Sequence, residues 1–190
     1  MGGERRPTAR DDFLGAFDIA LQPKILDFAA HLADLDADVL MFTARKAACL
    51  YDAMREVGLV RTRGEISSDR VLDMNLDWLA GKTVAVVDDV VITGSTLYRT
   101  RERLEEVGAS VSTHVLAVDR ENWVEDLVAP SNSRIHVGAR EALGLCTQIV
   151  NALSVVPRPY NLDWPLFQGI SIPNHDGIVL GGMPGWRTTD

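Results

Sequence analysis

Apolar residues recur along the chain in two alternating patterns, one typical of helices and one typical of buried strands. Ile25, Phe28, Leu32 and Leu35 are three or four residues apart, so they predict a helix over residues 23–35. The short apolar run over 39–42 predicts a strand. The same alternation continues and predicts helices over 47–57, 97–107 and 142–156, and strands over 83–87, 111–118 and 135–137.

Two segments depart from this alternation. Residues 59–78 are ambiguous, with a strand predicted around 60–66 and an exposed polar loop over 67–70. The tail, residues 157–190, holds five of the eight prolines and four of the twelve aromatic residues. Its rings at Tyr160, Trp164 and Phe167 are suited to stacking on a planar base, but packing over the sheet or against another subunit is slightly favoured.

Strands that alternate with helices predict an α/β fold with a mostly parallel central sheet flanked by helices. In such a sheet, ligands bind beyond the carboxyl ends of the strands. The 190 residues suit one domain, and 46% hydrophobic residues are enough for a sizeable core. We expect the core over about 36–156, with 1–35 and 157–190 outside it.

Charge and composition exclude several classes of function. The formal net charge of −8 argues against a broad nucleic-acid surface, because such binding depends on neutralising phosphates. No apolar run approaches the ~20 residues of a membrane span, and the start of the chain lacks a signal-peptide pattern, so a cytoplasmic protein is expected. Cys49 and Cys146 both lie in apolar helical patterns, which predicts two buried, reduced thiols.

One segment, residues 84–97 (VAVVDDVVITGSTL), carries recognisable chemistry. A buried strand is followed by Asp88 and Asp89, then by a hydroxyl-rich turn at a predicted helix start. Backbone N–H groups, hydroxyls and the positive end of the helix dipole suit a phosphate there, and Gly94 allows close approach. Carboxylates are strong acceptors for paired hydroxyls such as a ribose diol. A capped helix start would explain the acidic pair alone or the hydroxyl-rich turn alone. The two features together favour a ribose-5-phosphate site.

These residues resemble the type I phosphoribosyltransferases, with a distant similarity to orotate phosphoribosyltransferase-like members. The resemblance implies that Asp88 and Asp89 hold the ribose hydroxyls of phosphoribosyl pyrophosphate (PRPP), and that Asp89 contacts Mg²⁺ through water or substrate hydroxyls. It further implies that the 5′-phosphate lies in the loop formed by Thr93, Gly94, Ser95 and Thr96. Segments 1–35 and 157–190 would then form the hood that covers an acceptor base.

The resemblance extends to two other places. Arg45 and Lys46 follow the strand over 39–42 and would bind the diphosphate at a helix start. Arg120 directly follows the end of the strand over 111–118, and the resemblance implies that it would touch the base. A structural pair between Arg120 and Asp119 is about equally favoured. The resemblance thus implies Mg²⁺-dependent transfer of a phosphoribosyl group to a base-like small molecule, and a homodimer is left open.

A catalytically silent module that binds PRPP or a nucleotide and regulates a partner is the alternative. No glycine follows Arg45 and Lys46, and Lys82 is the sole lysine between Gly58 and Thr83, where related enzymes carry a lysine-bearing loop. Both departures favour the module. A purely structural α/β interaction protein is the third hypothesis, and it leaves the segment 88–96 unexplained.

Overall fold

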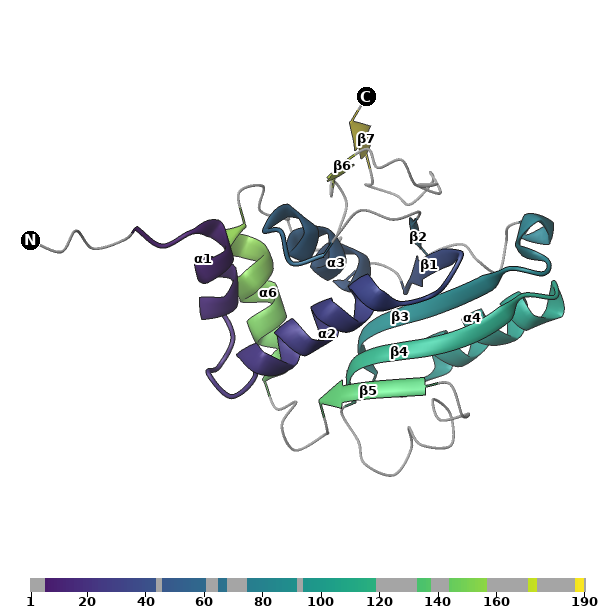
Figure 1. The fold of residues 1–190 in the computed structure, drawn as a ribbon, viewed down its shortest axis with the longest axis horizontal. Coiled ribbons are helices and arrows are strands. Elements are labelled where there is room, and N and C mark those ends of the chain that lie inside the picture. The colour runs from purple at the N-terminus through teal and green to yellow at the C-terminus, as the bar shows by residue number, and fades with distance from the viewer. Residues whose placement is uncertain are drawn as a thin grey trace, which may run out of the picture.

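A parallel sheet forms the centre of the molecule (Figure 1). The computed structural model describes residues 6–43, 46–60, 65–67, 75–91, 94–118, 133–137, 144–156, 171–173 and 187–189. In this sheet the strand order is β2-β1-β3-β4-β5, and every neighbouring pair is parallel. The five strands are β1 (Val39–Phe42), β2 (Glu65–Ser67), β3 (Thr83–Val91), β4 (Ser110–Val118) and β5 (Ser133–Val137). The predicted α/β class with a parallel sheet is confirmed.

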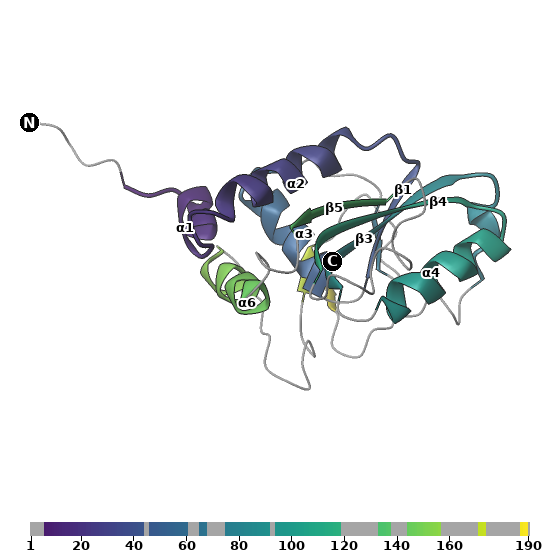
Figure 2. The same cartoon turned by 90° about the horizontal axis from the view of Figure 1, so that it is seen from below.

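Helices cover both faces of this sheet, and α2 and α4 lie on opposite sides of it (Figure 2). Short strands β6 and β7 pair in parallel as a separate two-stranded sheet. The helical elements are α1 (Ala9–Gly15), α2 (Gln22–Asp34), α3 (Lys46–Glu56), the 3-10 turn η2 (Asp77–Leu79), α4 (Ser95–Glu106) and α6 (Leu145–Val155), and the small sheet consists of β6 (Ser171–Pro173) and β7 (Arg187–Thr189).

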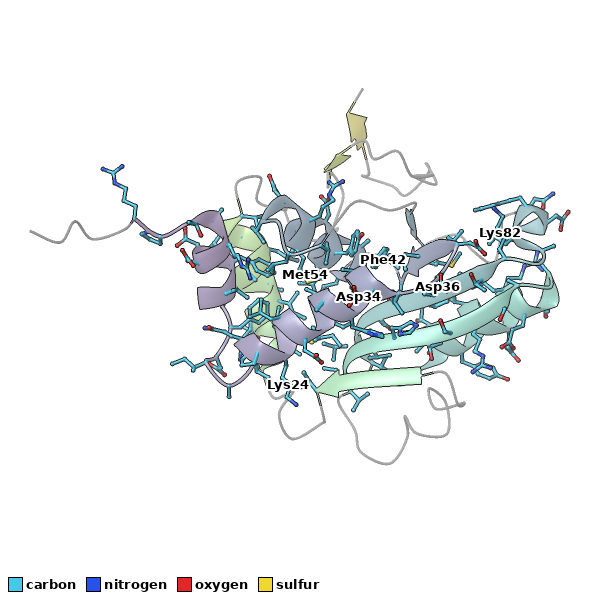
Figure 3. All side chains as sticks on the ribbon, viewed as in Figure 1. Lys24, Asp34, Asp36, Phe42, Met54 and Lys82 are labelled. Atoms are coloured by element: carbon cyan, nitrogen blue, oxygen red, sulfur yellow. The ribbon has the colours of Figure 1, made fainter. Side chains whose placement is uncertain are left out.

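Two hydrophobic cores form because successive side chains of a strand point to opposite faces. On one face, Ala85 and Val87 of β3 pack with apolar residues of α1, α2, α3 and α6. On the other, Val84 and Val86 pack with Leu97 and other residues of α4. Figure 3 shows the side chains of Phe42 and Met54, both of which belong to the first core. The labelled charged side chains, Lys24, Asp34, Asp36 and Lys82, are exposed.

Apolar residues between Phe13 and Leu32 contribute to the first core, although the segment 1–35 was expected to lie outside the core. Phe13 and Phe17 are buried there in an edge-to-face contact, with ring centroids 5.5 Å apart. Gln148 of α6 accepts from the Asp18 N–H and donates to the Asp18 carboxylate, both at 2.8 Å, and so ties α6 to the turn between α1 and α2. Helices α1, α2 and α6 therefore pack on the same side of the sheet as α3.

Several predicted boundaries differ from the structure. Strand β3 runs to Val91, in register with Val118 of β4, so the acidic pair lies inside the strand and does not follow it. Of the strand predicted around 60–66, residues 65 and 66 belong to β2, whereas residues 61–64 lie outside the described part. Helix α6 begins at Leu145 where the prediction began at 142, and residues 138–143 lie outside the described part. Cys146 is exposed, which makes the prediction of a second buried thiol wrong.

The connections place a natural binding position between β1 and β3. From β1 the chain crosses to β2 on one side, whereas β3, β4 and β5 follow on the other side. Such a reversal of strand order leaves a crevice at the carboxyl ends of the two central strands, where ligands of open α/β sheets bind. Within the described residues, no helix is both long and apolar enough to cross a membrane.

Candidate active site

The two acidic residues of β3 serve different faces of the sheet. Asp88 lines a cavity of about 230 Å³ together with the start of α4, whereas Asp89 is directed to α3, on the opposite side. The strand alternation causes this separation, because β3 continues through both residues. The predicted site residues are therefore brought together as two groups, one around each carboxylate.

The first group is built around Asp88. Thr43, directly after β1, donates its hydroxyl to Asp88 Oδ1 at 2.6 Å, and the Asp89 N–H donates to the same oxygen at 2.8 Å. The pKa of Asp88 is raised to about 7, mainly by burial and then by the charge of Asp89, whereas the hydrogen bonds from Thr43 and the Asp89 N–H act to lower it. Thr43 is a site residue that sequence reasoning missed; a small hydroxyl residue directly after a buried strand is the signal that was available.

The start of α4 forms the rest of the cavity. Among the described residues, its lining consists of Asp88, Val90, Val91, Gly94, Ser95, Thr96 and Leu97. Gly94 is buried and has a left-handed backbone with φ of 72°, and as the N-cap it offers no side chain to the first helical turn. A helix start without a side-chain cap leaves N–H groups for water or an anion. Ser95 and Thr96, the first two residues of α4, are exposed.

The second group joins α3, β3 and α6. Lys46 is the first residue of α3, and its Nζ lies 3.0 Å from Asp89 Oδ2 and 3.5 Å from Cys146 Sγ. The Asp89 side chain is only 6% exposed, so this ion pair neutralises a buried charge. Burial acts to lower the pKa of Lys46, but the charge and hydrogen bond of Asp89 outweigh it and raise that pKa overall.

Three of the predicted site residues, Arg45, Thr93 and Arg120, lie outside the described residues. Within the described part of the chain, no three His, Cys, Asp or Glu side chains come together as a metal site. A protein-only metal cage is therefore not formed by these residues. One or two carboxylates still fit a Mg²⁺ that arrives with a phosphorylated substrate, because this ion is commonly held by substrate oxygens and water.

The sequence was also compared with known families. The family model described as "Phosphoribosyl transferase domain" matches residues 39–139, just over half of the chain. The chain belongs to the phosphoribosyl transferase domain family. This match runs from the start of β1 to just beyond β5, so the phosphoribosyl transferase domain contains Thr43, Lys46, both aspartates and the start of α4. Cys146 and α6 lie after it.

Solved structures of phosphoribosyltransferases share 16–20% identity with this chain. Orotate phosphoribosyltransferase from Mycobacterium tuberculosis, in complex with PRPP, has 17% identity, a TM-score of 0.45, and coverage of 70% of this chain and 81% of its own. The enzyme from Aeropyrum pernix has 20% identity, a TM-score of 0.44, and coverage of 77% and 88%. A phosphoribosyltransferase from Corynebacterium diphtheriae has 20% identity, a TM-score of 0.43, and coverage of 70% of this chain and 81% of its own. No curated protein matches the chain.

Proposed function

We propose that this chain catalyses Mg²⁺-dependent transfer of the phosphoribosyl group from PRPP to a nucleobase-like acceptor, with release of pyrophosphate. The observation that carries the proposal is the cavity at the end of β3, which combines the Asp88 carboxyl with the uncapped start of α4. It lies between the carboxyl end of β3 and the start of α4, inside the segment that matches the phosphoribosyl transferase family. A carboxyl and an anion-binding helix start in one cavity suit a sugar phosphate.

The start of α4 would bind the 5′-phosphate. Its first-turn N–H groups and the positive end of the helix dipole attract an anion, and the hydroxyls of Ser95 and Thr96 add donors at the exposed side. Gly94 lets the backbone come close to the phosphate because it has no side chain. Thr93, which precedes Gly94 in the sequence, is proposed to contribute its hydroxyl and N–H group.

The ribose hydroxyls would bind to Asp88, which is the carboxyl that lines the cavity. Asp89 supports this end of the strand from the opposite face, where Lys46 balances its charge. The sequence-based assignment of both carboxylates to one diol thus becomes a division of labour. Asp88 would accept from the sugar, while Asp89 would hold Lys46 on the other face. A contact of Asp89 with Mg²⁺ through water would require Lys46 to leave this carboxylate first.

The diphosphate would lie near the turn between β1 and α3. Lys46 and Arg45 supply positive charge there, and the start of α3 adds its own N–H groups. Mg²⁺, when bound with PRPP, would stabilise the negative charge that develops on the departing diphosphate. The chain's own contribution is to hold the ribose, the 5′-phosphate and the diphosphate in a fixed relative position.

The transfer needs no nucleophilic side chain. A nitrogen lone pair of the acceptor forms the new bond to C1′, while the bond from C1′ to the diphosphate oxygen breaks and leaves its electron pair on that oxygen. The acceptor then loses its nitrogen-bound proton to solvent, so the products are a nucleotide and pyrophosphate. Positive charge develops on the ribose in the transition state, and the Asp88 carboxylate, which would bind the ribose, would stabilise that charge.

The remaining parts of the proposal concern the base, the cover of the site, the location of the protein and its oligomeric state. Arg120 would contact the base, and the segments 1–35 and 157–190 would cover it and exclude water. We propose a cytoplasmic location and leave a homodimer as an arrangement to be measured by sedimentation. The net charge of −8 favours a small phosphorylated ligand over a long nucleic acid.

A silent PRPP-binding module is the second candidate, and one observation favours it. Lys46 is bound to Asp89 and does not line the cavity, so its amine must leave a buried carboxylate before it can serve a diphosphate. Incubation with PRPP, Mg²⁺ and a panel of bases, with pyrophosphate release as the readout, separates the two candidates. An enzyme releases pyrophosphate with at least one base, and Asp88→Ala abolishes the release while the exposed control Asp36→Ala retains it. PRPP binding without release for any base contradicts the enzyme and supports the module.

A further inference from the structure

Thr43 is anchored at the end of β1, beside the acidic pair of β3. It is only 3% exposed, and its backbone N–H donates to the carbonyl oxygen of Val87 at 2.9 Å. Its hydroxyl has two acceptors within reach, the same Val87 carbonyl at 3.4 Å and Asp88 Oδ1 at 2.6 Å. The shorter contact shows that the hydroxyl is directed to the carboxyl, although a backbone acceptor is close enough to satisfy it.

This bond makes the two oxygens of Asp88 unequal. Oδ1 accepts from both the Thr43 hydroxyl and the Asp89 N–H, so its acceptor positions are occupied from within the protein. Both of these donors end on Oδ1, and neither contacts Oδ2. Since Asp88 lines the cavity, Oδ2 is the oxygen that remains for a ligand. The two donors to Oδ1 thereby fix the rotation of the carboxyl group.

The turn between β1 and α3 holds the acidic pair from both ends. Thr43, before the turn, binds Asp88 on the face of the cavity, and Lys46, after it, binds Asp89 on the other face. Both contacts cross from the chain around β1 to strand β3, which is its direct neighbour in the sheet. A shift of this turn must therefore move or release the side chain that would bind the ribose.

We propose that Thr43 is a positioning residue for the phosphoribosyl site: its hydroxyl orients the Asp88 carboxyl so that Oδ2 is presented to the ribose hydroxyls of PRPP. The inference rests on the proposed function, because PRPP is the ligand that Asp88 would serve. A site whose acceptor is already held in its binding orientation loses less conformational freedom on binding. Loss of the Thr43 hydroxyl should therefore weaken ligand binding even though Thr43 does not line the cavity.

Calorimetric titration with PRPP and Mg²⁺ tests this role in four variants of the full chain, with Asp88→Ala alone as the reference for the double variant. Thr43→Val removes the hydroxyl at nearly constant volume, and Thr43→Ser keeps it. Thr100→Val is the matched control, since Thr100 is an equally buried threonine that does not line the cavity. Thr43→Val combined with Asp88→Ala asks whether Thr43 acts through Asp88. Thermal unfolding of each variant verifies folding, and Thr43→Ala replaces Thr43→Val if the latter does not fold.

We expect Thr43→Val to weaken PRPP binding about tenfold, as for the loss of one hydrogen bond to a charged group. Thr43→Ser and Thr100→Val should stay within about twofold of the wild type. In the Asp88→Ala background, Thr43→Val should add no further loss. Unchanged affinity of Thr43→Val, failure of Thr43→Ser to restore binding, or full additivity with Asp88→Ala overturns the positioning role alone. Absence of PRPP binding by the wild type overturns the proposed function, and the role of Thr43 with it.

Discussion

Lys46 and Asp89 form an ion pair, 3.0 Å from Nζ to Oδ2, that joins the first residue of α3 to the middle of the central sheet. The carboxylate is buried, whereas the lysine side chain is 27% exposed. A buried carboxylate that loses its cation is left without compensation for its lost hydration. The pair is therefore expected to matter for stability as well as for the diphosphate.

The first prediction concerns this ion pair. Lys46→Gln should lower the free energy of unfolding by about 1–3 kcal/mol, because the buried Asp89 charge remains while its partner is gone. Asp89→Asn should relieve that cost, so the double variant should be more stable than additive losses predict. Urea unfolding of the two single variants and the double variant gives the coupling energy. A coupling of zero would show that the ion pair contributes nothing to the fold.

The second prediction concerns the pH dependence of stability at Asp88. Its pKa is raised to about 7 in the folded state, mainly by burial, from an ordinary value of 3.8. Between these two pH values, Asp88 keeps its proton in the folded chain but has lost it in the unfolded chain. The free energy of unfolding therefore falls as the pH rises from about 4 to about 7. Asp88→Asn removes the titration and keeps an oxygen acceptor for Thr43.

The free energy of unfolding of Asp88→Asn minus that of the wild type should increase by at least ~1 kcal/mol from pH 5 to pH 8, since one pKa unit corresponds to about 1.4 kcal/mol. Urea unfolding at both pH values measures the difference. The exposed variant Asp36→Asn should show no such trend. A gain for Asp88→Asn that is equal at pH 5 and pH 8 would contradict a raised pKa.

The third prediction concerns Gly94. Alanine at a left-handed φ of 72° costs about 1–2 kcal/mol, and at this position it also blocks close approach of a phosphate. Gly108 offers a matched control, because its φ is 86° and a Cβ there meets nothing within 4 Å. Gly94→Ala and Gly108→Ala should lose similar stability, but only Gly94→Ala should weaken PRPP binding, by tenfold or more. Equal binding by both variants would place the phosphate elsewhere.

The fourth prediction separates the two thiols. Cys49 is fully buried, and burial raises the pKa of its thiol well above the usual range, so little thiolate forms. Cys146 is exposed in the first turn of α6, next to the Lys46 amine. Brief treatment of the folded protein with iodoacetamide should add one carbamidomethyl group, at Cys146, as determined by mass spectrometry of peptides. Labelling of Cys49 at a comparable rate would contradict the packing of α3.

Local patterns predicted the elements well because each buried face repeats at a regular spacing. The spacing of Ile25, Phe28 and Leu32 gave α2 to within one residue at each end. The predicted strand ended at residue 87, whereas β3 ends at Val91. Apolar residues lie on both sides of the aspartates, so the local pattern allows a strand that stops before them or one that continues past them. Continuation to Val91 is decided by pairing with β4, which local periodicity does not contain.

The site was predictable only where its residues are neighbours in sequence. The acidic pair and the start of α4 lie within one segment, so their chemistry was apparent together. Contacts between distant segments were not: Lys46 meets Cys146, 100 residues away, and His31 Nε2 lies 2.8 Å from His114 Nδ1 across 83 residues. The opposite orientation of Asp88 and Asp89 follows from strand alternation, once β3 is known to include both.

The most direct measurement of the central claim is a calorimetric titration of the full chain with PRPP in the presence of Mg²⁺. We expect one PRPP per chain, with binding weakened in Asp88→Ala and in Gly94→Ala, and with Asp36→Ala equal to the wild type. Wild-type protein that releases no binding heat with PRPP and gains no thermal stability from it would contradict a phosphoribosyl site between β1 and β3.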